Sequence, residues 1–459
     1  MAMRQPGDIL LVATYELGHQ PLAVAWPAAF LERQGYAPAV MDVSVEPFDA
    51  EKARRARVVA ISVPMHTALR LGVRVAEQVR AVNPACHICF YGLYATLNAN
   101  HLLSHGADSV IGGESEAPLV ELVEALESAR LSAPPHPART HLAKLAFPVP
   151  SRSALPSLKK YARLARGGRL ELVGYVEASR GCKHTCKHCP IPPVYGGRFF
   201  VVPRAVVLAD VRQQVAAGAT HVTFGDPDFL NGPRHAIEIA RAVHDEFPTL
   251  TFDVTAKVEH LLRHRALLPE LAAHGCAFVV TAVESLSDTV LTNLDKGHTG
   301  TDVTEALGAL RSVGIAMRPT WVPFTPWTTL GDYRAMLDFI EGEALVDHVD
   351  PVQYSIRLLM PPGSLLLESA AMRPHLGPLA ERDFYHSWRH PEPAMDALHQ
   401  AVSALVSSAA DREEDSAVTF DGVRRLADEA AGAPPRPSVA ARLARDRERP
   451  PHLTEPWFC

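Results

Sequence analysis

Three cysteines on one short loop constrain this chain more than any other feature. Cys182, Cys186 and Cys189 follow the spacing C-x3-C-x2-C, directly after an apolar stretch at residues 172–176 that predicts a strand. Three thiolates can hold three irons of a [4Fe–4S] cube and leave the fourth iron open for a further ligand. We therefore expect an iron–sulfur cluster with one open iron on this loop.

A structural zinc site is the alternative interpretation of the same loop. His184 and His188 lie between the cysteines and could compete as zinc ligands. Zinc usually draws four protein ligands from paired knuckles, and no second knuckle follows in the sequence. The spacing therefore favours the cluster over zinc.

At these residues the chain resembles the radical S-adenosylmethionine (SAM) superfamily. The signature of that superfamily is C-x3-C-x-φ-C, where φ is usually aromatic. His188 stands at φ here, a departure that still offers a flat ring. The resemblance implies that the open iron chelates the amino and carboxylate groups of SAM, and that an electron from the cluster cleaves a C–S bond of the sulfonium. It therefore implies a [4Fe–4S] cluster and SAM as cofactors, with His188 among the residues that bind them.

Length and composition place the chain among ordinary globular proteins. Its 459 residues suggest about three units, and its 47% hydrophobic and 21% charged content is typical of a folded core. A net charge of -6 without a long basic block argues against nucleic acid as the main partner. No apolar run reaches membrane length and the first residues lack a signal peptide, so we expect no membrane partner. Seven cysteines without a regular even framework indicate a reducing compartment, and we expect the cytoplasm.

Residues 1–128 alternate short apolar strands with amphipathic helices. This alternation predicts an α/β domain with a doubly wound, Rossmann-like parallel sheet. The expected strands are residues 8–14, 37–43, 58–63, 87–92 and 109–114, and the clearest helices are 22–34 and 67–82. Ligands of such sheets bind at the carboxyl ends of the strands, at the switch point of strand order.

This first domain resembles the cobalamin-binding domain that precedes many radical SAM domains. Gly92 and Gly113 stand after the fourth and fifth strands, where that family places its contacts to the nucleotide loop. The motif Asp-x-His-x-x-Gly is absent, so no histidine is positioned to replace the lower base of cobalamin. Radical SAM relatives often bind cobalamin without that histidine. Cobalamin binding and a domain that only packs on its neighbour both stay open at this stage.

The remaining chain divides into three parts. Residues 129–170 are Pro-rich and polar, which predicts a linker. Residues 171–365 again alternate strand and helix, and the expected strands are 171–177, 221–225, 251–256, 277–283, 316–322 and 352–356. Six such units fit the partial (β/α)6 barrel that the radical SAM resemblance implies, with its site at the carboxyl ends of the strands. Residues 366–459 form a helical C-terminal region and tail, with helices expected over 394–409 and 420–431.

Acidic residues recur at the ends of the predicted barrel strands. Asp226 and Asp228 follow the second strand, similar to the glycine-acidic motif of the family, and a carboxylate there can accept hydrogen bonds from the SAM ammonium. An Asp-Pro turn or a helix cap is the alternative. Glu284 ends the fourth strand in a stretch similar to the E-S…L-x-x-L-x-K-G signature of cobalamin-associated radical SAM domains, and it could bind the ribose hydroxyls. We expect Lys296 and Gly297 to end the following helix, because a cation and a left-handed cap both suit that position.

Three cations complete the predicted cofactor-binding set. Lys257 follows the third strand and could neutralise the SAM carboxylate, with a surface ion pair as the alternative. Arg318 lies on the fifth strand. Arg357 lies at the end of the last strand, where it could bind a carboxylate.

The last residue, Cys459, is the one candidate catalytic residue. A terminal thiol can fold back as a ligand to a metal, a metalloid or the cluster, and a disordered tail is the alternative. The Glu455-Pro456 pair resembles the ending of the CUAEP/CCAEP-tail radical SAM subgroup, which is linked to transfer of a 3-amino-3-carboxypropyl group from SAM to arsenic. His452 and Leu453 stand where that subgroup has its paired chalcogens, which puts arsenic chemistry in doubt here.

The sequence therefore predicts a radical SAM enzyme that modifies a small metabolite and draws electrons from a donor such as flavodoxin or ferredoxin. Cobalamin-dependent methyl transfer is the first prediction. Transfer of a 3-amino-3-carboxypropyl group to a soft acceptor such as arsenic, without cobalamin, is the alternative. A non-catalytic iron–sulfur or zinc regulatory protein is the competing class. The substrate depends on loop shape and is not readable from motifs.

Overall fold

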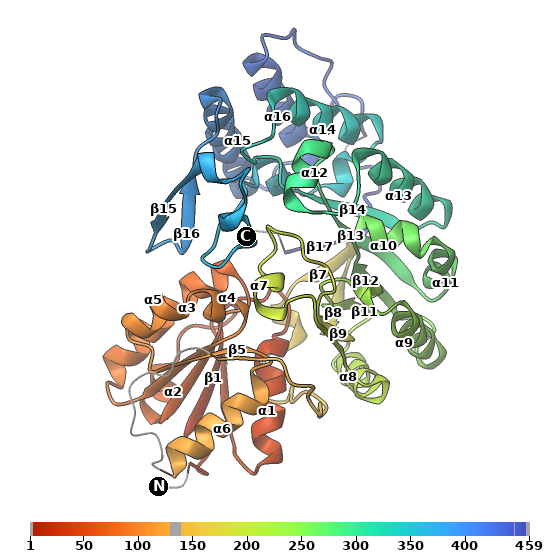
Figure 1. Cartoon of the computed structure of the whole chain (residues 1–459). Helices are drawn as coiled ribbons and strands as arrows, with labels where there is room; N and C mark the ends of the chain where they lie inside the picture. Colours follow the sequence, from red (N-terminus) through yellow and green to blue (C-terminus); the bar gives the residue numbers. More distant parts are fainter. Residues whose placement is uncertain (1–2, 129–138, 445, 456–459) are drawn as a thin grey trace.

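The computed structural model describes residues 3–128, 139–444 and 446–455, which fold into two α/β domains that pack against each other (Figure 1). The N-terminal domain has one parallel sheet in the order β2-β1-β3-β4-β5-β6. Its strands are β1 Ile9–Ala13, β2 Ala39–Asp42, β3 Val58–Ser62, β4 His87–Tyr91, β5 Ser109–Gly113 and β6 Arg139–His141. Every residue of β1 and β3 is buried, because helices cover both faces of the sheet, and this explains why these strands read as continuous apolar runs. The predicted doubly wound domain is confirmed.

The helices of this domain divide between the two faces of the sheet. They are α1 Leu22–Arg33, α2 Ala50–Arg55, α3 His66–Val82, α4 Leu93–Leu97, α5 Ala99–Ser104 and α6 Glu116–Glu127. α1 and α6 share a core with Ile9 and Leu11 of β1, whereas α3 and α5 pack on the alternate side chains Leu10 and Val12. The strand order reverses between β1 and β3, so the loops after these two strands border the switch point.

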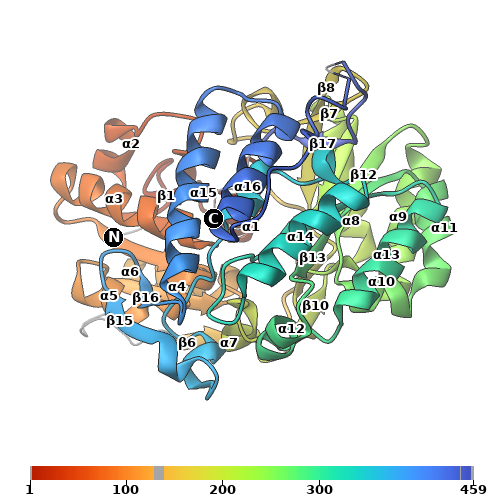
Figure 2. The same cartoon turned by 90° about the horizontal axis from the view of Figure 1, so that it is seen from above.

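The second domain is a curled sheet whose main strands are parallel, with helices on its outer side (Figures 1 and 2). Its strands are β8 Arg169–Val176, β11 His221–Phe224, β12 Thr251–Thr255, β13 Cys276–Glu284 and β14 Ala316–Trp321. The helices that follow them are α8 Arg204–Ala216, α9 Pro233–Glu246, α10 Val258–Arg263, α11 Leu268–Ala273, α12 Asp288–Leu294, α13 Gly300–Ser312 and α14 Leu330–Gly342. The predicted partial barrel is confirmed as a fold.

The prediction of a sixth barrel strand over residues 352–356 is wrong. The segment forms a 3-10 helix, Pro351–Ser355, and a single parallel bridge between Phe324 and Arg357 marks the sixth position. Pro351 stands at the first position of this helix, where its fixed φ suits a helical turn and its missing N–H is not needed.

Three segments connect the two domains in addition to their direct packing. The predicted linker supplies β6 to the first sheet and β7, Arg163–Arg166, to the second. Near the C-terminus, β17, His452–Leu453, pairs with β7 of the second sheet, and Glu455 just after it accepts a hydrogen bond from Tyr15 of the first domain. The hairpin of β15, Leu376–Ala380, and β16, Tyr385–Trp388, places the buried Phe384 against the His101 ring of the first domain at 4.9 Å.

The C-terminal region contains the two helices that the sequence predicts. They are α15 Pro393–Asp411 and α16 Ser416–Ala430, which pack against each other and against the barrel. Within the described residues no helix combines the length and the apolar character that a membrane crossing requires.

Candidate active site

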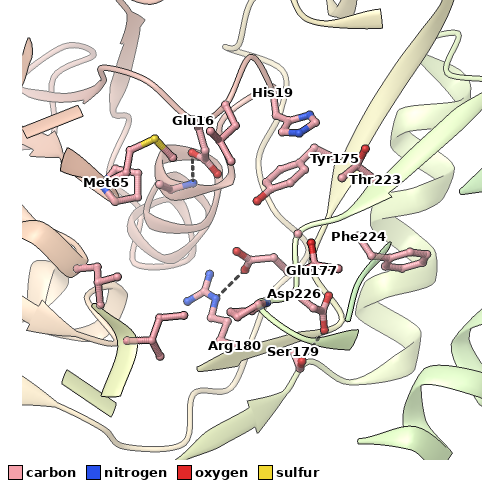
Figure 3. Close-up of a pocket in the computed structure, with 18 of the residues that line it drawn as sticks. Glu16, His19, Met65, Tyr175, Glu177, Ser179, Arg180, Thr223, Phe224 and Asp226 are labelled. Carbon is pink, nitrogen blue, oxygen red and sulfur yellow. Dashed lines mark hydrogen bonds and ion pairs between the residues drawn. The ribbon is translucent and has the colours of Figure 1, made fainter. Parts of the chain in front are cut away.

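A cavity of about 480 Å³ lies between the two domains (Figure 3). The carboxyl ends of both sheets face it, as the parallel strand geometry predicts. Residues at or after the strand ends of the first domain line one wall: Glu16, Ser62, Tyr91 and Gly113. Residues on or after the barrel strands line the other wall: Tyr175, Phe224, Asp226, Thr255, Ala282 and Thr320. Both domains therefore open into one shared space.

The cysteine loop sits at the edge of this cavity. Its base is the short antiparallel pair of β9, Ser179–Gly181, and β10, Phe199–Val201, and it is followed by α7, Ile191–Tyr195. Hydrogen bonds from Lys187 N to Leu294 O (2.9 Å) and from Lys183 Nζ to Asn231 O (2.6 Å) tie the loop to the barrel. The loop is thus positioned by both local pairing and tertiary contacts.

The three thiols fit a cluster better than a single zinc ion. Burial raises the pKa of Cys182 and raises the pKa of Cys189 to about 12, and the neighbouring thiols add to both shifts. Zn–S bonds of about 2.3 Å would require the sulfurs to lie within about 4.6 Å of one another. Across the described parts of the chain, the one group of three metal-ligating side chains whose ligand atoms all lie within 4.8 Å does not include these cysteines. Wider spacing suits a cube, because each cysteine then binds a different iron.

Glu284 lies behind the cysteine loop and not on the cavity wall. It ends β13 with a positive φ of 64°. Its Oε1 lies 3.0 Å from Lys296 Nζ and 3.3 Å from His188 Nε2. Burial acts to raise the pKa of Glu284, but the Lys296 charge and the His188 hydrogen bond outweigh it and hold this pKa well below its usual range. The structure therefore connects His188 of the loop to the barrel through Glu284.

Lys296 does not end the helix that precedes it, which corrects our expectation. The residue in the left-handed cap conformation is Asp295, with φ 56°. Lys296 is 2% exposed and its ammonium group turns inward to Glu284. Burying a carboxylate without a partner costs more free energy than leaving an exposed helix end without a cation. The ion pair with Glu284 therefore decides the conformation of the Lys296 side chain.

Asp226 and Asp228 occupy different places. Asp226 lines the cavity, where its carboxylate accepts hydrogen bonds from Ala178 N (2.9 Å) and from the Ser179 hydroxyl. Burial raises the pKa of Asp226 to about 7. Asp228 is fully buried away from the cavity wall, and its Oδ1 accepts a hydrogen bond from Leu230 N at the start of a 3-10 helix. Asp228 therefore forms the helix cap that was the alternative for this motif.

The three predicted cations also separate. Arg318 lines the cavity and donates to Asp350 Oδ1 at 2.7 Å. Lys257 is buried outside the cavity wall, 3.6 Å from Glu259 Oε2. Arg357 lies farther away, paired with Asp396 at 2.7 Å and stacked 3.6 Å above the Trp388 ring. Arg318 is the one of the three that faces the shared space.

Gly92 and Gly113 both line the cavity with positive φ angles of 102° and 73°. A Cβ on Gly113 would lie 2.2 Å from the carbonyl oxygen of His141. Glycine is therefore required there for the close approach of β5 and β6.

Several residues of the cavity were missed by our sequence analysis. His19 stacks on Tyr175 with ring centroids 4.4 Å apart, and burial lowers the pKa of His19 to about 4. Glu16 accepts hydrogen bonds from Leu22 N and Ala23 N at the start of α1, and burial raises its pKa to about 8. Nothing in the sequence around these two residues marks them as part of a site.

Arg180 is the central cation of the domain interface, and it was also missed. It stands in β9, directly before the cysteine loop, and forms ion pairs with Glu177 of its own domain and with Glu114 and Glu116 of the first domain. Figure 3 shows its guanidinium directed toward Glu177 at the cavity edge. Its position two residues before Cys182 is the signal that could have identified it.

Residues of the C-terminal tail reach the same region. Leu453 lines the cavity, and Glu455 Oε1 accepts a hydrogen bond of 2.7 Å from Tyr15 of the first domain. The candidate catalytic residue Cys459 lies outside the described residues, so its role stays a prediction.

Comparison with known proteins agrees with this architecture. A B12 binding domain model matches residues 9–123, and a radical SAM superfamily model matches residues 176–325. An uncharacterized methyltransferase of Pyrococcus horikoshii, PH0819, is 25% identical over 281 residues, which cover 57% of this chain and 58% of that protein. The ribosomal protein uS12 methylthiotransferase RimO of Desulfosudis oleivorans is 26% identical over 39% of this chain and 43% of its own length. The chain thus spans about half the length of these curated relatives.

Solved structures share the fold at low sequence identity. The cobalamin-dependent SAM radical enzyme OxsB with aqua-cobalamin bound superposes with a TM-score of 0.69 at 14% identity, over 88% of this chain and 67% of its own. The radical SAM methyltransferase TsrM of Kitasatospora setae, with tryptophan and a SAM analog bound, gives a TM-score of 0.58 at 18% identity, over 73% of this chain and 71% of its own.

A three-thiol loop on a parallel half-barrel that faces a Rossmann-like domain defines a class of iron–sulfur enzyme. The chain contains a radical SAM domain, matched over residues 176–325, and an N-terminal B12 binding domain, matched over residues 9–123. A radical SAM domain implies a [4Fe–4S] cluster and SAM as cofactors, and the first domain supports cobalamin as a third. The loops after β1 and β3, beside the switch point, line the cavity with Glu16 and Met65, which is where a ligand of such a domain is expected.

Proposed function

We propose that this enzyme is a cobalamin-dependent radical SAM methyltransferase that acts on a small molecule. The observation that carries the proposal is the single cavity to which both sheets present the carboxyl ends of their strands. A reaction that uses two cofactors on different domains needs both to reach the same substrate atom, and holding reactants in one site lowers the barrier substantially. The methyltransferase names of the archaeal relative and of TsrM support this choice.

The residues of the site take distinct roles in this proposal. Cys182, Cys186 and Cys189 hold the cluster, and Glu284 with Lys296 fixes the loop through His188. When bound, the cluster supplies electrons and cobalamin supplies methyl-transfer chemistry. Each of these roles leaves the cavity itself free for SAM and substrate.

Charged residues of the cavity wall position the ligands. Asp226 faces the cavity and is suited to an ammonium group of SAM, whereas Arg318 is suited to a carboxylate. His19 is neutral near pH 7, since burial disfavours its cationic form, and the neutral ring can hydrogen-bond a bound ligand without taking up a proton. Glu16, with its pKa raised to about 8, is instead protonated near neutral pH and can donate a hydrogen bond.

The remaining expectations accompany the proposal. A small-molecule substrate suits a cavity of about 480 Å³, and a donor such as flavodoxin or ferredoxin would reduce the cluster. A reducing cytoplasm suits an oxygen-sensitive cluster. That nucleic acid is not a partner stays a prediction.

Anaerobic reconstitution tests the proposal. The protein is loaded with iron and sulfide, reduced with dithionite, and incubated with SAM in the presence or absence of hydroxocobalamin, and products are identified by mass spectrometry. We expect S-adenosylhomocysteine only when cobalamin is present, and no product from a Cys186→Ser variant. Methylthioadenosine would instead support the 3-amino-3-carboxypropyl route. 5′-Deoxyadenosine without any cobalamin dependence would refute methyl transfer.

A further inference from the structure

A second group of metal-ligating side chains lies beside the cysteine loop and uses none of its thiols. His184 comes from that loop, Asp228 follows β11, and His260 lies on α10, so three separate elements converge. One ligand atom from each side chain lies within 4.8 Å of the other two. The residues are 15%, 1% and 5% exposed in their side chains, so the group is largely shielded from water.

The distances within the group suit a single metal ion. His184 Nε2 and His260 Nε2 are 3.2 Å apart, and Asp228 Oδ2 lies 3.7 Å from His184 Nε2 and 2.8 Å from His260 Nδ1. Two ligand atoms that bind one tetrahedral zinc at about 2.0–2.1 Å are separated by about 3.3 Å. The distances of Asp228 Oδ2 from His260 Nδ1 and from His184 Nε2 lie on either side of this value.

The hydrogen bonding of the group is incomplete without a further partner. His260 Nδ1 is buried and has no hydrogen-bond partner despite its closeness to Asp228. A buried polar atom without a partner costs about 1–3 kcal/mol, so such an atom in a native fold calls for an explanation. A cation bound by His184 Nε2, Asp228 Oδ2 and His260 Nδ1 would give this buried nitrogen a partner.

The surrounding charges allow a cation. The carboxylate of Asp228 contributes one negative charge, and Glu259 Oε2 lies 3.6 Å from His184 Nδ1. Lys257 is a buried cation of the same region, and its ammonium group lies 3.6 Å from the same Glu259 carboxylate, which offsets its charge. A carboxylate close to a ligating histidine is also the usual second partner that orients its ring in metal sites.

We propose that His184, Asp228 and His260 bind a Zn²⁺ ion next to the cluster. Two histidines and one carboxylate are a ligand set that zinc takes in proteins, and three protein ligands leave a further coordination position open. The ion links the cysteine loop to α10 and to the segment that follows β11, and so adds a second tie between the loop and the barrel. The proposal does not depend on methyl transfer or on cobalamin.

Zinc binding to the cluster-loaded protein tests the site. The full chain is reconstituted with iron and sulfide, exposed anaerobically to Zn²⁺, desalted, and analysed for both metals by plasma mass spectrometry. We expect about one zinc beside about four irons per chain. X-ray absorption at the zinc edge should show nitrogen and oxygen neighbours at about 2.0–2.1 Å and no sulfur at about 2.3 Å.

Two near-isosteric variants and one control make the test decisive. Asp228→Asn keeps the cap on Leu230 N, and His260→Gln keeps a polar side chain on α10. Each should reduce zinc to the background level while iron stays near four per chain, which shows that the protein is folded and loaded. His264→Gln is the control, because its ring lies 5.6 Å from His260 but outside the group, and it should retain zinc. Zinc retained by both variants, sulfur neighbours in the absorption spectrum, or no zinc in the parent protein would each overturn the proposal.

Discussion

Arg180 holds the two domains together electrostatically, and its removal gives the strongest stability prediction. Its side chain is 13% exposed, and its Nη1 lies 3.3 Å from Glu114 Oε2, whose side chain is 1% exposed. Glu116, 3% exposed, pairs with the same Nη1. In Arg180→Met both carboxylates lose their cation, because the apolar replacement offers no charge to the other side of the interface.

The expected cost is several kcal/mol. Coulomb's law with an effective dielectric constant of about 20 gives about 5 kcal/mol for two charges 3.3 Å apart. Breaking a buried pair from one side typically costs about 3–5 kcal/mol, since the remaining charge stays buried without a partner. We therefore expect Arg180→Met to lower the free energy of unfolding by about 3–5 kcal/mol at pH 8.

The cost should depend on pH in a defined direction. Burial raises the pKa of Glu114, and the Arg180 charge is the first influence that opposes it. Without Arg180 the folded-state pKa rises further above the unfolded value of about 4.3, so the folded variant binds protons more tightly than its unfolded chain. The deficit is therefore largest above the raised pKa and shrinks as pH falls toward 5.

Urea denaturation of the cluster-free protein, followed by circular dichroism at pH 8 and pH 5.5, measures both effects. Arg212→Met is the matched control, because its pair with Glu246 is 53% and 33% exposed and such pairs contribute about 0–1 kcal/mol. Adding Glu116→Gln to Arg180→Met should recover part of the loss at pH 8. A deficit no larger than that of the Arg212 variant, or one that does not change with pH, would refute the interpretation of Arg180 as a buried interdomain ion partner.

Three further predictions concern the site. Cys189→Ser should lose the cluster, seen as iron well below four per chain and loss of the broad absorbance near about 400 nm. Asp226 has a pKa of about 7, so its carboxylate ionises between pH 6 and pH 8 and the protein should bind SAM more tightly as pH rises over this range. Asp226→Asn should weaken SAM binding about 10- to 100-fold at pH 8 and remove the pH dependence, as measured by calorimetry. Gly113→Ala should lower the urea midpoint far more than Gly106→Ala, because both have positive φ but only Gly113 would place a Cβ 2.2 Å from the carbonyl oxygen of His141. Equal losses in the two glycine variants would assign the effect to φ alone.

The elements of the fold were predictable because each domain repeats one local pattern. The buried parallel strands read as apolar runs, and α3 shows its buried face at Leu69, Gly72, Val75 and Val79. The strand expected over residues 352–356 does not form, although the local composition resembles a strand. The segment instead forms a 3-10 helix that packs against α15. Which residues complete a sheet is decided by neighbours far away in the chain.

The cysteine loop was predictable from the spacing of the cysteines alone, whereas the positions and roles of the residues around it were not. Asp226 and Asp228 are two positions apart in one motif, and only the path of the backbone decides that one faces the cavity and the other caps a turn. Lys296 was assigned to a helix end because the sequence does not show that Glu284 is buried beside it. Arg180 pairs with glutamates more than 60 positions earlier in the chain, a distance at which sequence patterns carry no information about contact.

Because one wall of the cavity belongs to each domain, the volume offered to a substrate is set by the docking of two independent folds. A small rotation of one sheet relative to the other would change the shape of the cavity without disturbing either hydrophobic core. New substrates could therefore be accommodated in evolution by exchanges at the contact between the domains, while the residues that hold the cofactors stay as they are.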